Sequence, residues 1–329
     1  FLFIMEMEIT MKKCALHSLG CKVNSYETQA MQKMMESAGY EIVPFGEEIA
    51  DIYIINTCSV TNIADRKSRQ MIHKAKKLNP EAVVAAAGCY VESAGDNIDE
   101  DVDIVIGNNE KSHLIEILNE YFEHMDKEKS VDIGKATDFD ELNIDSPLEH
   151  TRAYVKIQDG CNRFCSYCII PYVRGRIRSR KPDDVMAEIK RVAASGCKEV
   201  VLTGIHLSSY GLDFKDSTVK LIDVIEAVNR IEGIERIRLG SLEPLIVTEE
   251  FVRRLAKCKK ICPHFHLSLQ SGCDETLKRM NRRYNVDEYY KGVELLREYF
   301  PDAAVTTDVI VGLSLIHISE PTRQAEISY

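Results

Sequence analysis

The segment from Arg152 to Pro182, RAYVKIQDGCNRFCSYCIIPYVRGRIRSRKP, carries three cysteines directly after an apolar run. Cys161, Cys165 and Cys168 are separated by three and then two residues. A structural zinc site usually takes four protein ligands, often from two C-x2-C pairs, and no second pair lies nearby in the sequence. An iron–sulfur cluster is held by cysteine thiolates, and three suffice when an outside ligand binds the fourth iron. The spacing therefore favours an iron–sulfur cluster, with zinc or buried structural cysteines as the alternatives.

The composition is that of a globular protein with ordinary cores. A length of 329 residues is typical of two domains, and 45% of the residues are hydrophobic. No apolar run approaches the ~20 residues that cross a bilayer, and the first ten residues do not resemble a signal peptide, so we expect a cytoplasmic location. The net charge of −10 argues against non-specific coating of nucleic acid, although it allows a local basic patch.

Short apolar runs alternate with helical segments in both halves of the chain. In residues 11–125 the alternation predicts a doubly wound parallel sheet, with strands at 12–21, 51–58, 82–89 and 102–107. The polar segment 126–149 is expected to be a linker. In residues 150–312 the same alternation predicts a full or partial (β/α) barrel, with a second open sheet as the alternative. Its strands are expected at 152–160, 199–204, 236–244, 264–270 and 304–312.

Three further cysteines, Cys21, Cys58 and Cys89, each end a predicted strand of the first sheet. Ligands collect at the carboxyl ends of the strands in such a sheet, so these cysteines can converge on one point. Ordinary core cysteines are the alternative, because cysteine is commonly buried.

The motif CNRFCSYC resembles the cluster motif of the radical S-adenosylmethionine (SAM) enzymes. GCKVN, NTCSVT and GCY, around the other three cysteines, resemble the signatures of the N-terminal domain of the methylthiotransferases. The resemblance runs from about Met11 to Gly312. It is closest to the branch that modifies N6-threonylcarbamoyladenosine in tRNA, whereas other branches act on isopentenyladenosine or on a ribosomal protein.

This resemblance implies two 4Fe–4S clusters and SAM as cofactors. Cys161, Cys165 and Cys168 would hold the cluster that cleaves SAM to a 5′-deoxyadenosyl radical, and the other triad an auxiliary cluster. The implied reaction uses two SAM molecules to place a methylthio group on C2 of the adenine next to the anticodon. Its partners would be tRNA and an electron donor such as flavodoxin or ferredoxin. Alternatives are the same chemistry on another substrate, or a non-catalytic iron–sulfur or zinc protein.

Other candidate cofactor-binding residues follow from the expected barrel strands. The resemblance places the residues after the second strand near SAM, and active sites lie at the carboxyl ends of barrel strands. In HFHLSLQ the strand period puts His264, His266, Ser268 and Gln270 on one face, and Gln270 is nearest the carboxyl end. The candidates are Thr203, Gly204, His206, Ser241, Glu243 and Gln270.

A basic run follows the three cysteines of the opening motif. Such a run is usually a solvated face, but its place beside a cluster motif favours contact with tRNA phosphates or SAM. Phosphate contacts would position the RNA, and the modified base would have to be extruded into the pocket. The candidate RNA-binding residues are Arg174, Arg176, Arg178, Arg180 and Lys181.

The two ends of the chain depart from the family pattern. Residues 1–10 are read as a possible non-native leader before a start at Met11, with starts at Met5 or Met7 as the alternatives. Beyond Gly312 the family continues into a helix and an RNA-binding β-barrel called TRAM, whereas residues 313–329 resemble a translated sequencing adapter as far as Arg323. We therefore expect a C-terminally truncated radical SAM core that lacks TRAM, with weakened folding and activity.

Overall fold

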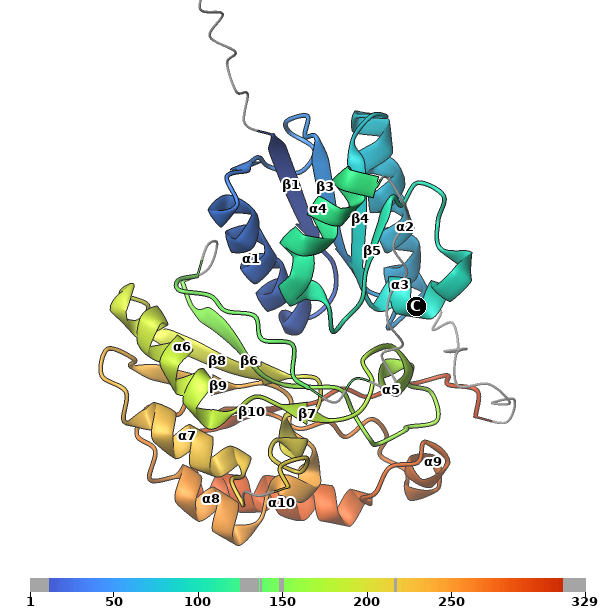
Figure 1. The fold of residues 1–329 in the computed structure, drawn as a ribbon. Helices are drawn as coiled ribbons and strands as arrows, with labels where there is room; N and C mark the ends of the chain where they lie inside the picture. Colours follow the sequence, from blue (N-terminus) through green and yellow to red (C-terminus); the bar gives the residue numbers. More distant parts are fainter. Residues whose placement is uncertain (1–11, 125–135, 137, 148–150, 216–217, 316–329) are drawn as a thin grey trace, which may run out of the picture.

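The computed structural model describes residues 12–124, 136, 138–147, 151–215 and 218–315. The expected leader and most of the expected tail, residues 316–329, lie outside this part. Within it the chain forms two lobes, each built on a mostly parallel sheet (Figure 1). No helix in these ranges is long and apolar enough to cross a membrane.

The first lobe is a five-stranded parallel sheet with helices on both faces. Its strands, in sheet order, are β2 (Glu41–Ile42), β1 (Lys13–Ser18), β3 (Ile52–Thr57), β4 (Val83–Gly88) and β5 (Ile104–Ile106). β3 is buried along its whole length, as expected of a central strand covered on both sides. The expected doubly wound sheet is therefore confirmed, and the short edge strand β2 is an addition to it.

The helices of this lobe divide between the two faces of the sheet (Figure 1). Methionines of α1 (Lys22–Ser37) pack with leucines of α4 (Leu114–His124) over one face. Residues of α2 (Asn62–Leu78) and α3 (Cys89–Ala94) cover the other. Thr61 caps α2 by accepting a hydrogen bond from the Ala64 N–H at 3.0 Å, which satisfies a free donor of the first turn.

The second lobe is a partial barrel, as expected. Its larger sheet has the order β7 (Arg178–Ser179), β6 (Ala153–Asp159), β8 (Glu199–Gly204) and β9 (Arg236–Leu239). β10 (His264–His266) pairs with β11 (Ala304–Thr306), and bridges such as Leu242–Leu267 continue the sheet between the two groups. The antiparallel edge strand β7 was not expected from the sequence.

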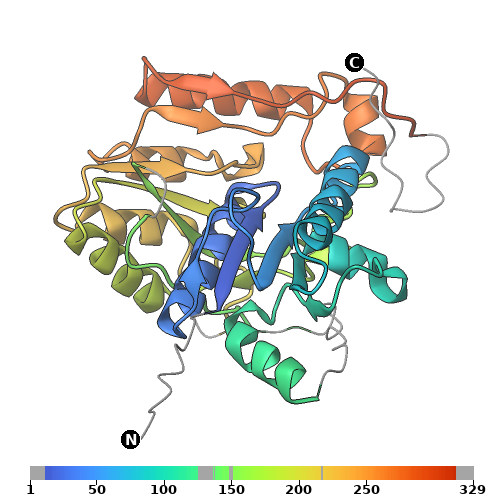
Figure 2. The same ribbon diagram turned by 90° about the horizontal axis from the view of Figure 1, so that it is seen from above.

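Helices cover the outer face of this second sheet, as Figures 1 and 2 show. They are α6 (Pro182–Ala194), α7 (Leu221–Asn229), α8 (Glu249–Leu255) and α10 (Val286–Tyr299). Two shorter helices lie elsewhere: α5 (Ile170–Val173) follows the cysteine motif, and α9 (Asp274–Arg279) follows β10.

The two lobes share a core at their junction. α1 packs against β6 and β8, and its Tyr26 and Ala30 join the apolar core of the barrel lobe. Leu142 and Ile144 are buried in the same core, although the sequence suggested a polar linker there. Two apolar side chains two residues apart suffice to anchor an otherwise polar segment, and so weak a pattern is not distinctive in a sequence.

Candidate metal centres

Cys21, Cys58 and Cys89 meet at one edge of the first sheet. Cys21 is the N-cap of α1, Cys58 follows β3 directly, and Cys89 begins α3 directly after β4. Because β1, β3 and β4 are parallel neighbours, their carboxyl ends lie side by side. The structure therefore brings these three cysteines together.

Two glycines allow this close approach. Gly20 has φ +98°, and a Cβ at this position would lie 2.8 Å from the Cys58 Sγ. Gly88 has φ +97°, and its Cβ would lie 2.4 Å from the Thr57 carbonyl oxygen. Both positions combine the left-handed region with a crowded neighbour, so only glycine fits. The Gly20-Cys21 and Gly88-Cys89 pairs thus mark tight packing as well as a candidate ligand.

Asn24 and Ser68 fix the turns that carry these thiols. Asn24 donates from Nδ2 to the carbonyls of Leu19 at 2.7 Å and Thr57 at 2.8 Å, while its Oδ1 lies 3.9 Å from the Cys21 Sγ. Ser68 Oγ accepts the Cys58 N–H at 3.0 Å. Asn24 was not singled out from the sequence, although it belongs to the GCKVN motif.

The environment of this triad is unfavourable for free thiolates. Burial raises the pKa of Cys58 to about 11, and the neighbouring Cys89 and Cys21 add to the rise. Burial also raises the pKa of Cys89, against the opposite effect of the Arg174 guanidinium and the Lys111 ammonium. Three convergent thiols of this kind suit a metal group, because bound iron holds cysteine as thiolate.

The second triad lies on the loop after β6. Cys161 follows this strand by two residues, and the loop carries Cys165 and Cys168 before it enters α5. Burial raises the pKa of Cys168 to about 12, and the thiols of Cys165 and Cys161 act in the same direction. This is the position that the sequence predicted, a cysteine loop at the carboxyl end of the first barrel strand.

A glycine again sets the start of this loop. Gly160 has φ +67°, and a Cβ here would lie 1.8 Å from the Arg176 carbonyl oxygen. The Cys161 N–H donates to the Gly175 carbonyl at 3.0 Å, so the chain after α5 lies beside the start of the loop. The Arg163 N–H points at the Cys161 Sγ, at 3.4 Å.

The connection after α9 braces this loop from outside. Ser166 donates from Oγ to the Arg279 carbonyl at 2.6 Å and from N–H to the Met280 carbonyl at 3.1 Å. Asn281, with φ +57°, donates from Nδ2 to the Phe164 carbonyl at 2.9 Å. More than a hundred residues separate the partners, so no local pattern indicates these contacts.

Two predicted residues, Glu243 and His206, are connected to the second triad by Arg163. Arg163 pairs with the Glu243 carboxylate, and the His206 Nε2 lies 3.6 Å from the same group. Although burial alone raises the pKa of Glu243, His206 and Arg163 hold it below its usual value. A cavity of about 290 Å³ lies beside Glu243 and Arg163, and Tyr210 and Lys220 also line it.

Gln270, a third predicted residue, is linked to the same loop through Tyr167. Its Oε1 accepts from the Tyr167 hydroxyl at 3.0 Å, and this hydroxyl also accepts from Arg282 Nη2 at 2.8 Å. Gln270 has φ +67°, which is uncommon for a residue other than glycine. Sequence reasoning missed Arg163 and Arg282.

The other predicted cofactor-binding residues lie farther along the strand ends. Thr203 and Gly204 end β8, where Thr203 is buried and Gly204 packs against Gln158. Ser241, after β9, is exposed. The structure thus connects His206, Glu243 and Gln270 with the cysteine loop and gives Thr203, Gly204 and Ser241 other surroundings.

The expected basic surface is divided between the interior and the solvent. Arg174, Arg178 and Arg180 are at most 1% exposed, so RNA contact by these three side chains was a wrong expectation. Burial removes them from phosphates, and carboxylates of the protein pair with them instead. Only Arg176 and Lys181 of the run are exposed, and the Arg176 guanidinium lies over the Phe164 ring at 4.5 Å.

The sequence matches two family models. The one described as the Radical SAM superfamily covers residues 155–320, and the one described as Uncharacterized protein family UPF0004 covers residues 13–107. The chain is 42% identical over 306 residues to the threonylcarbamoyladenosine tRNA methylthiotransferase MtaB of Bacillus subtilis, which covers 92% of this chain and 67% of that protein. The protein of the same name from Aquifex aeolicus is 42% identical over 305 residues, with coverages of 91% and 73%.

A relative of a different name is somewhat less similar. The tRNA-2-methylthio-N(6)-dimethylallyladenosine synthase of Clostridium botulinum is 35% identical over 309 residues, with coverages of 90% and 67%. Among solved structures, the radical SAM methyltransferase TsrM from Kitasatospora setae has a TM-score of 0.62 at 14% identity, over 91% of this chain and 67% of that one. The cobalamin-dependent radical enzyme OxsB also has a TM-score of 0.62, at 11% identity, with coverages of 92% and 49%. At such identities the likeness concerns the fold alone.

Proposed function

This chain belongs to the tRNA methylthiotransferases of the radical SAM superfamily, and we propose that it places a methylthio group on C2 of N6-threonylcarbamoyladenosine next to the anticodon of tRNA. The reaction would consume two SAM molecules. The observation that carries this proposal is the presence of two separate three-cysteine sites, one at the carboxyl ends of β1, β3 and β4 and one on the loop after β6. A single triad would support only a generic radical enzyme.

The two sites have distinct roles in this proposal. Cys161, Cys165 and Cys168 would hold the 4Fe–4S cluster that binds SAM, and Cys21, Cys58 and Cys89 would hold the auxiliary one. When bound, these groups supply the radical and the sulfur chemistry, while the protein orients the reactants and excludes competing reactions. The donor sets fit this role, because each offers three free thiols and leaves a position for an outside ligand.

The residues around the second triad would bind SAM. The Arg163–Glu243 pair and His206 present charged and hydrogen-bonding groups beside the cysteine loop, and Gln270 reaches it through Tyr167. We assign these residues to orienting the cofactor's polar groups. Thr203, Gly204 and Ser241 would contribute only through the shape of the strand ends.

The choice of substrate rests on the relatives. Identity is 36–42% to the relatives named for threonylcarbamoyladenosine, three of them at 41–42%, and 35–36% to those named for dimethylallyladenosine. The exposed Arg176 and Lys181 are the members of the basic run that can reach RNA phosphates. A base modified at C2 has to be unstacked and bound in a pocket, as single-stranded loops of RNA allow.

Two experiments test the proposal. Anaerobic reconstitution should load about eight iron atoms per chain, and addition of SAM and a reductant should release 5′-deoxyadenosine. Bound zinc without SAM cleavage would refute it.

Nucleoside mass spectrometry of tRNA from a deletion strain tests the substrate. The methylthio form of N6-threonylcarbamoyladenosine should disappear and return when the full-length gene is supplied. Loss of the dimethylallyl counterpart instead would reassign the substrate and leave the chemistry unchanged.

A further inference from the structure

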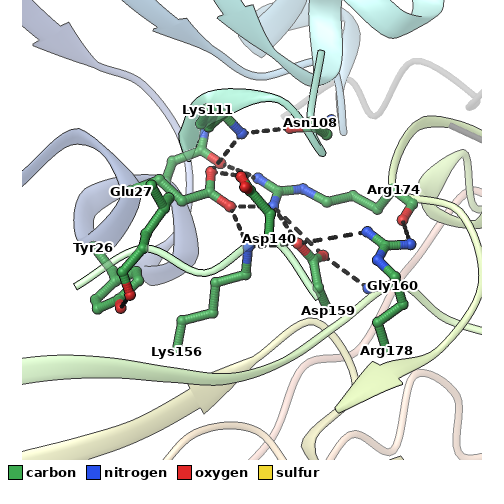
Figure 3. Close-up of polar contacts among 12 residues, drawn as sticks. Tyr26, Glu27, Asn108, Lys111, Asp140, Lys156, Asp159, Gly160, Arg174 and Arg178 are labelled. Carbon is green, nitrogen blue, oxygen red and sulfur yellow. Dashed lines mark hydrogen bonds and ion pairs between the residues drawn. The ribbon is translucent and has the colours of Figure 1, made fainter. Parts of the chain in front are cut away.

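Five ionisable side chains lie buried at the junction of the two lobes, and we call them the junction charges (Figure 3). Glu27 comes from α1, Lys111 from the short helix η2 (Lys111–His113), Lys156 and Asp159 from β6, and Arg174 from the residue after α5. Each is at most 1% exposed. Buried charges are rare in proteins unless they are paired, and this group spans the boundary between the lobes.

Glu27 is the centre of the group. Its carboxylate lies 2.7 Å from the Lys111 Nζ, 2.7 Å from the Lys156 Nζ and 2.6 Å from the Arg174 Nη1. Asp159 pairs with Lys156 at 2.6 Å and with Arg174 at 3.2 Å. The group thus ties α1 of the first lobe to the strand that leads into the Cys161 loop.

Positive charge is in excess here. Three cations face two carboxylates among the junction charges. Two buried neighbours, Arg178 and Asp140, add one charge of each sign. Glu92 lies at the margin, and burial raises its pKa to about 7, so it offsets the excess only in part. An uncompensated buried charge is costly, and such an excess calls for an anionic partner.

The excess positive charge extends toward the triad of Cys21, Cys58 and Cys89. Arg174 donates from Nη2 to the Asn24 Oδ1 at 2.6 Å, and the Cys21 Sγ lies 3.9 Å from the same oxygen. The guanidinium also opposes the rise that burial causes in the pKa of the Cys89 thiol. Three thiolates around a 4Fe–4S core leave a negative charge, which increases on reduction.

We propose that Arg174 is a positioning residue whose buried charge compensates the auxiliary cluster held by Cys21, Cys58 and Cys89 and raises its reduction potential. This inference rests on the proposed function, which assigns a cluster to that triad. Glu27 balances Arg174 and limits the effect. The same contacts fix β6 against α1 and therefore keep the distance between the two proposed cluster sites constant.

Removal of the Arg174 charge and removal of the Glu27 charge should shift the reduction potential of the auxiliary cluster in opposite directions. Arg174→Gln removes a positive charge next to the cluster, so reduction becomes harder and the potential falls. Glu27→Gln removes a negative charge from the same group, so the potential rises. Both variants lose stability, because each leaves buried partners unpaired. A purely structural role would produce the loss of stability without shifts of opposite sign.

The experiment uses the full chain with Cys161, Cys165 and Cys168 replaced by alanine, so that a single cluster is measured. The protein is reconstituted anaerobically and its potential is determined by a redox titration followed by electron paramagnetic resonance. Arg174→Lys is the conservative variant and should keep most of the parent potential. Arg180→Gln is the matched control: Arg180 belongs to the same run and is equally buried, but it pairs with Glu188 and Glu141, and its replacement should leave the potential unchanged.

A lower potential for Arg174→Gln, a higher one for Glu27→Gln and an unchanged one for Arg180→Gln would support the inference. Unchanged potentials in the first two variants, or shifts of the same sign, would overturn it. If Arg174→Gln does not fold, Glu27→Gln alone decides, since a potential that fails to rise contradicts the proposal. A parent chain that binds no iron would instead refute the assignment of the cluster itself, which is the proposed function.

Discussion

Five cysteines of this chain directly follow a glycine, but only three of these glycines are crowded. A Cβ at Gly20, Gly88 or Gly160 would meet another atom within 3 Å, whereas Gly196 and Gly272 have nothing within 4 Å. The crowded glycines precede Cys21, Cys89 and Cys161, which belong to the two proposed cluster sites. At the scale of single residues, close packing therefore distinguishes these cysteines from the others.

Gly160→Ala should disrupt the second site selectively. The new Cβ would collide with the Arg176 carbonyl at 1.8 Å, so the cysteine loop must shift. We expect the iron content of the reconstituted chain to fall from about eight to about four atoms. Gly196→Ala is the matched control, because it has a positive φ in open space; it should keep its iron and cost about 1–2 kcal/mol. Full iron in Gly160→Ala would contradict the packing argument.

Glu92 predicts a pH dependence of stability. Burial raises its pKa from 4.5 to about 7, although it accepts the Asn108 N–H at 2.6 Å. A raised pKa stabilises the fold below pH 4.5, and this contribution is lost as the pH rises through 7. Glu92→Gln should reduce this decline in the free energy of unfolding by roughly 1–3 kcal/mol. The measurement is urea unfolding of the cluster-free chain from pH 4 to 8. The exposed Glu120 offers a control, since Glu120→Gln should leave the decline as it is.

At the scale of elements, the end of α9 and its connection to α10 act as a brace. They contact the cysteine loop through the backbone of Arg279 and Met280 and through the side chain of Asn281. The conformation of Asn281 is left-handed, with φ +57°, which asparagine tolerates better than most residues. We therefore expect retention of the proposed second cluster to depend on a segment that carries none of its proposed ligands.

Asn281→Gly should loosen the loop without straining the backbone, because glycine adopts the same φ and loses only the side-chain hydrogen bonds. We expect faster loss of iron from the second site under a chelator and unchanged retention at the first. Asn285→Ala controls for general loss of stability: Asn285 caps α10 by accepting the Glu288 N–H at 2.8 Å, and its loss should cost about 1 kcal/mol. Equal iron loss in both variants would argue against a specific brace.

At the scale of the whole molecule, α1 joins the two lobes through neighbouring residues with different partners. Tyr26 donates to the Leu142 carbonyl and to the Glu188 carboxylate, which also pairs with Arg180. Although burial by itself raises the pKa of Glu27, Arg174 and the two junction lysines hold it well below its usual range. The lobes therefore share charged as well as apolar contacts, and we expect them to unfold together.

Unfolding of the cluster-free chain in urea should show one transition, with coincident far-UV circular dichroism and tyrosine fluorescence. Glu27→Gln leaves buried cations unpaired and should cost about 3–5 kcal/mol. Glu36→Gln, on the exposed end of the same helix, should change stability by less than about 0.5 kcal/mol. Separate transitions for the two probes in the parent chain would show that the junction does not couple the lobes.

The fold class and the positions of both cysteine triads were accessible from the sequence. Alternating apolar runs indicate parallel sheets, and the carboxyl ends of parallel strands coincide in space, so Cys21, Cys58 and Cys89 could be expected to meet. The similarity to known methylthiotransferases bears out the family that these motifs suggested. The brace at Asn281 was out of reach, because its contacts join residues far apart in the chain.

The tertiary structure alone decided which side chains of the basic run are buried and which carboxylates they pair with. Its spacing is the same whether the side chains meet solvent or carboxylates, and Arg174 pairs with Glu27, 147 residues away in the chain. Docking of α1 against β6 brings Glu27 to Arg174, and packing of α6 against β6 brings Glu188 to Arg180. The sequence by itself determined the main strands and the residue type of the expected ligands, because these depend on local pattern and residue type. The folded chain decided which charges face solvent, because burial and pairing depend on contacts between distant segments.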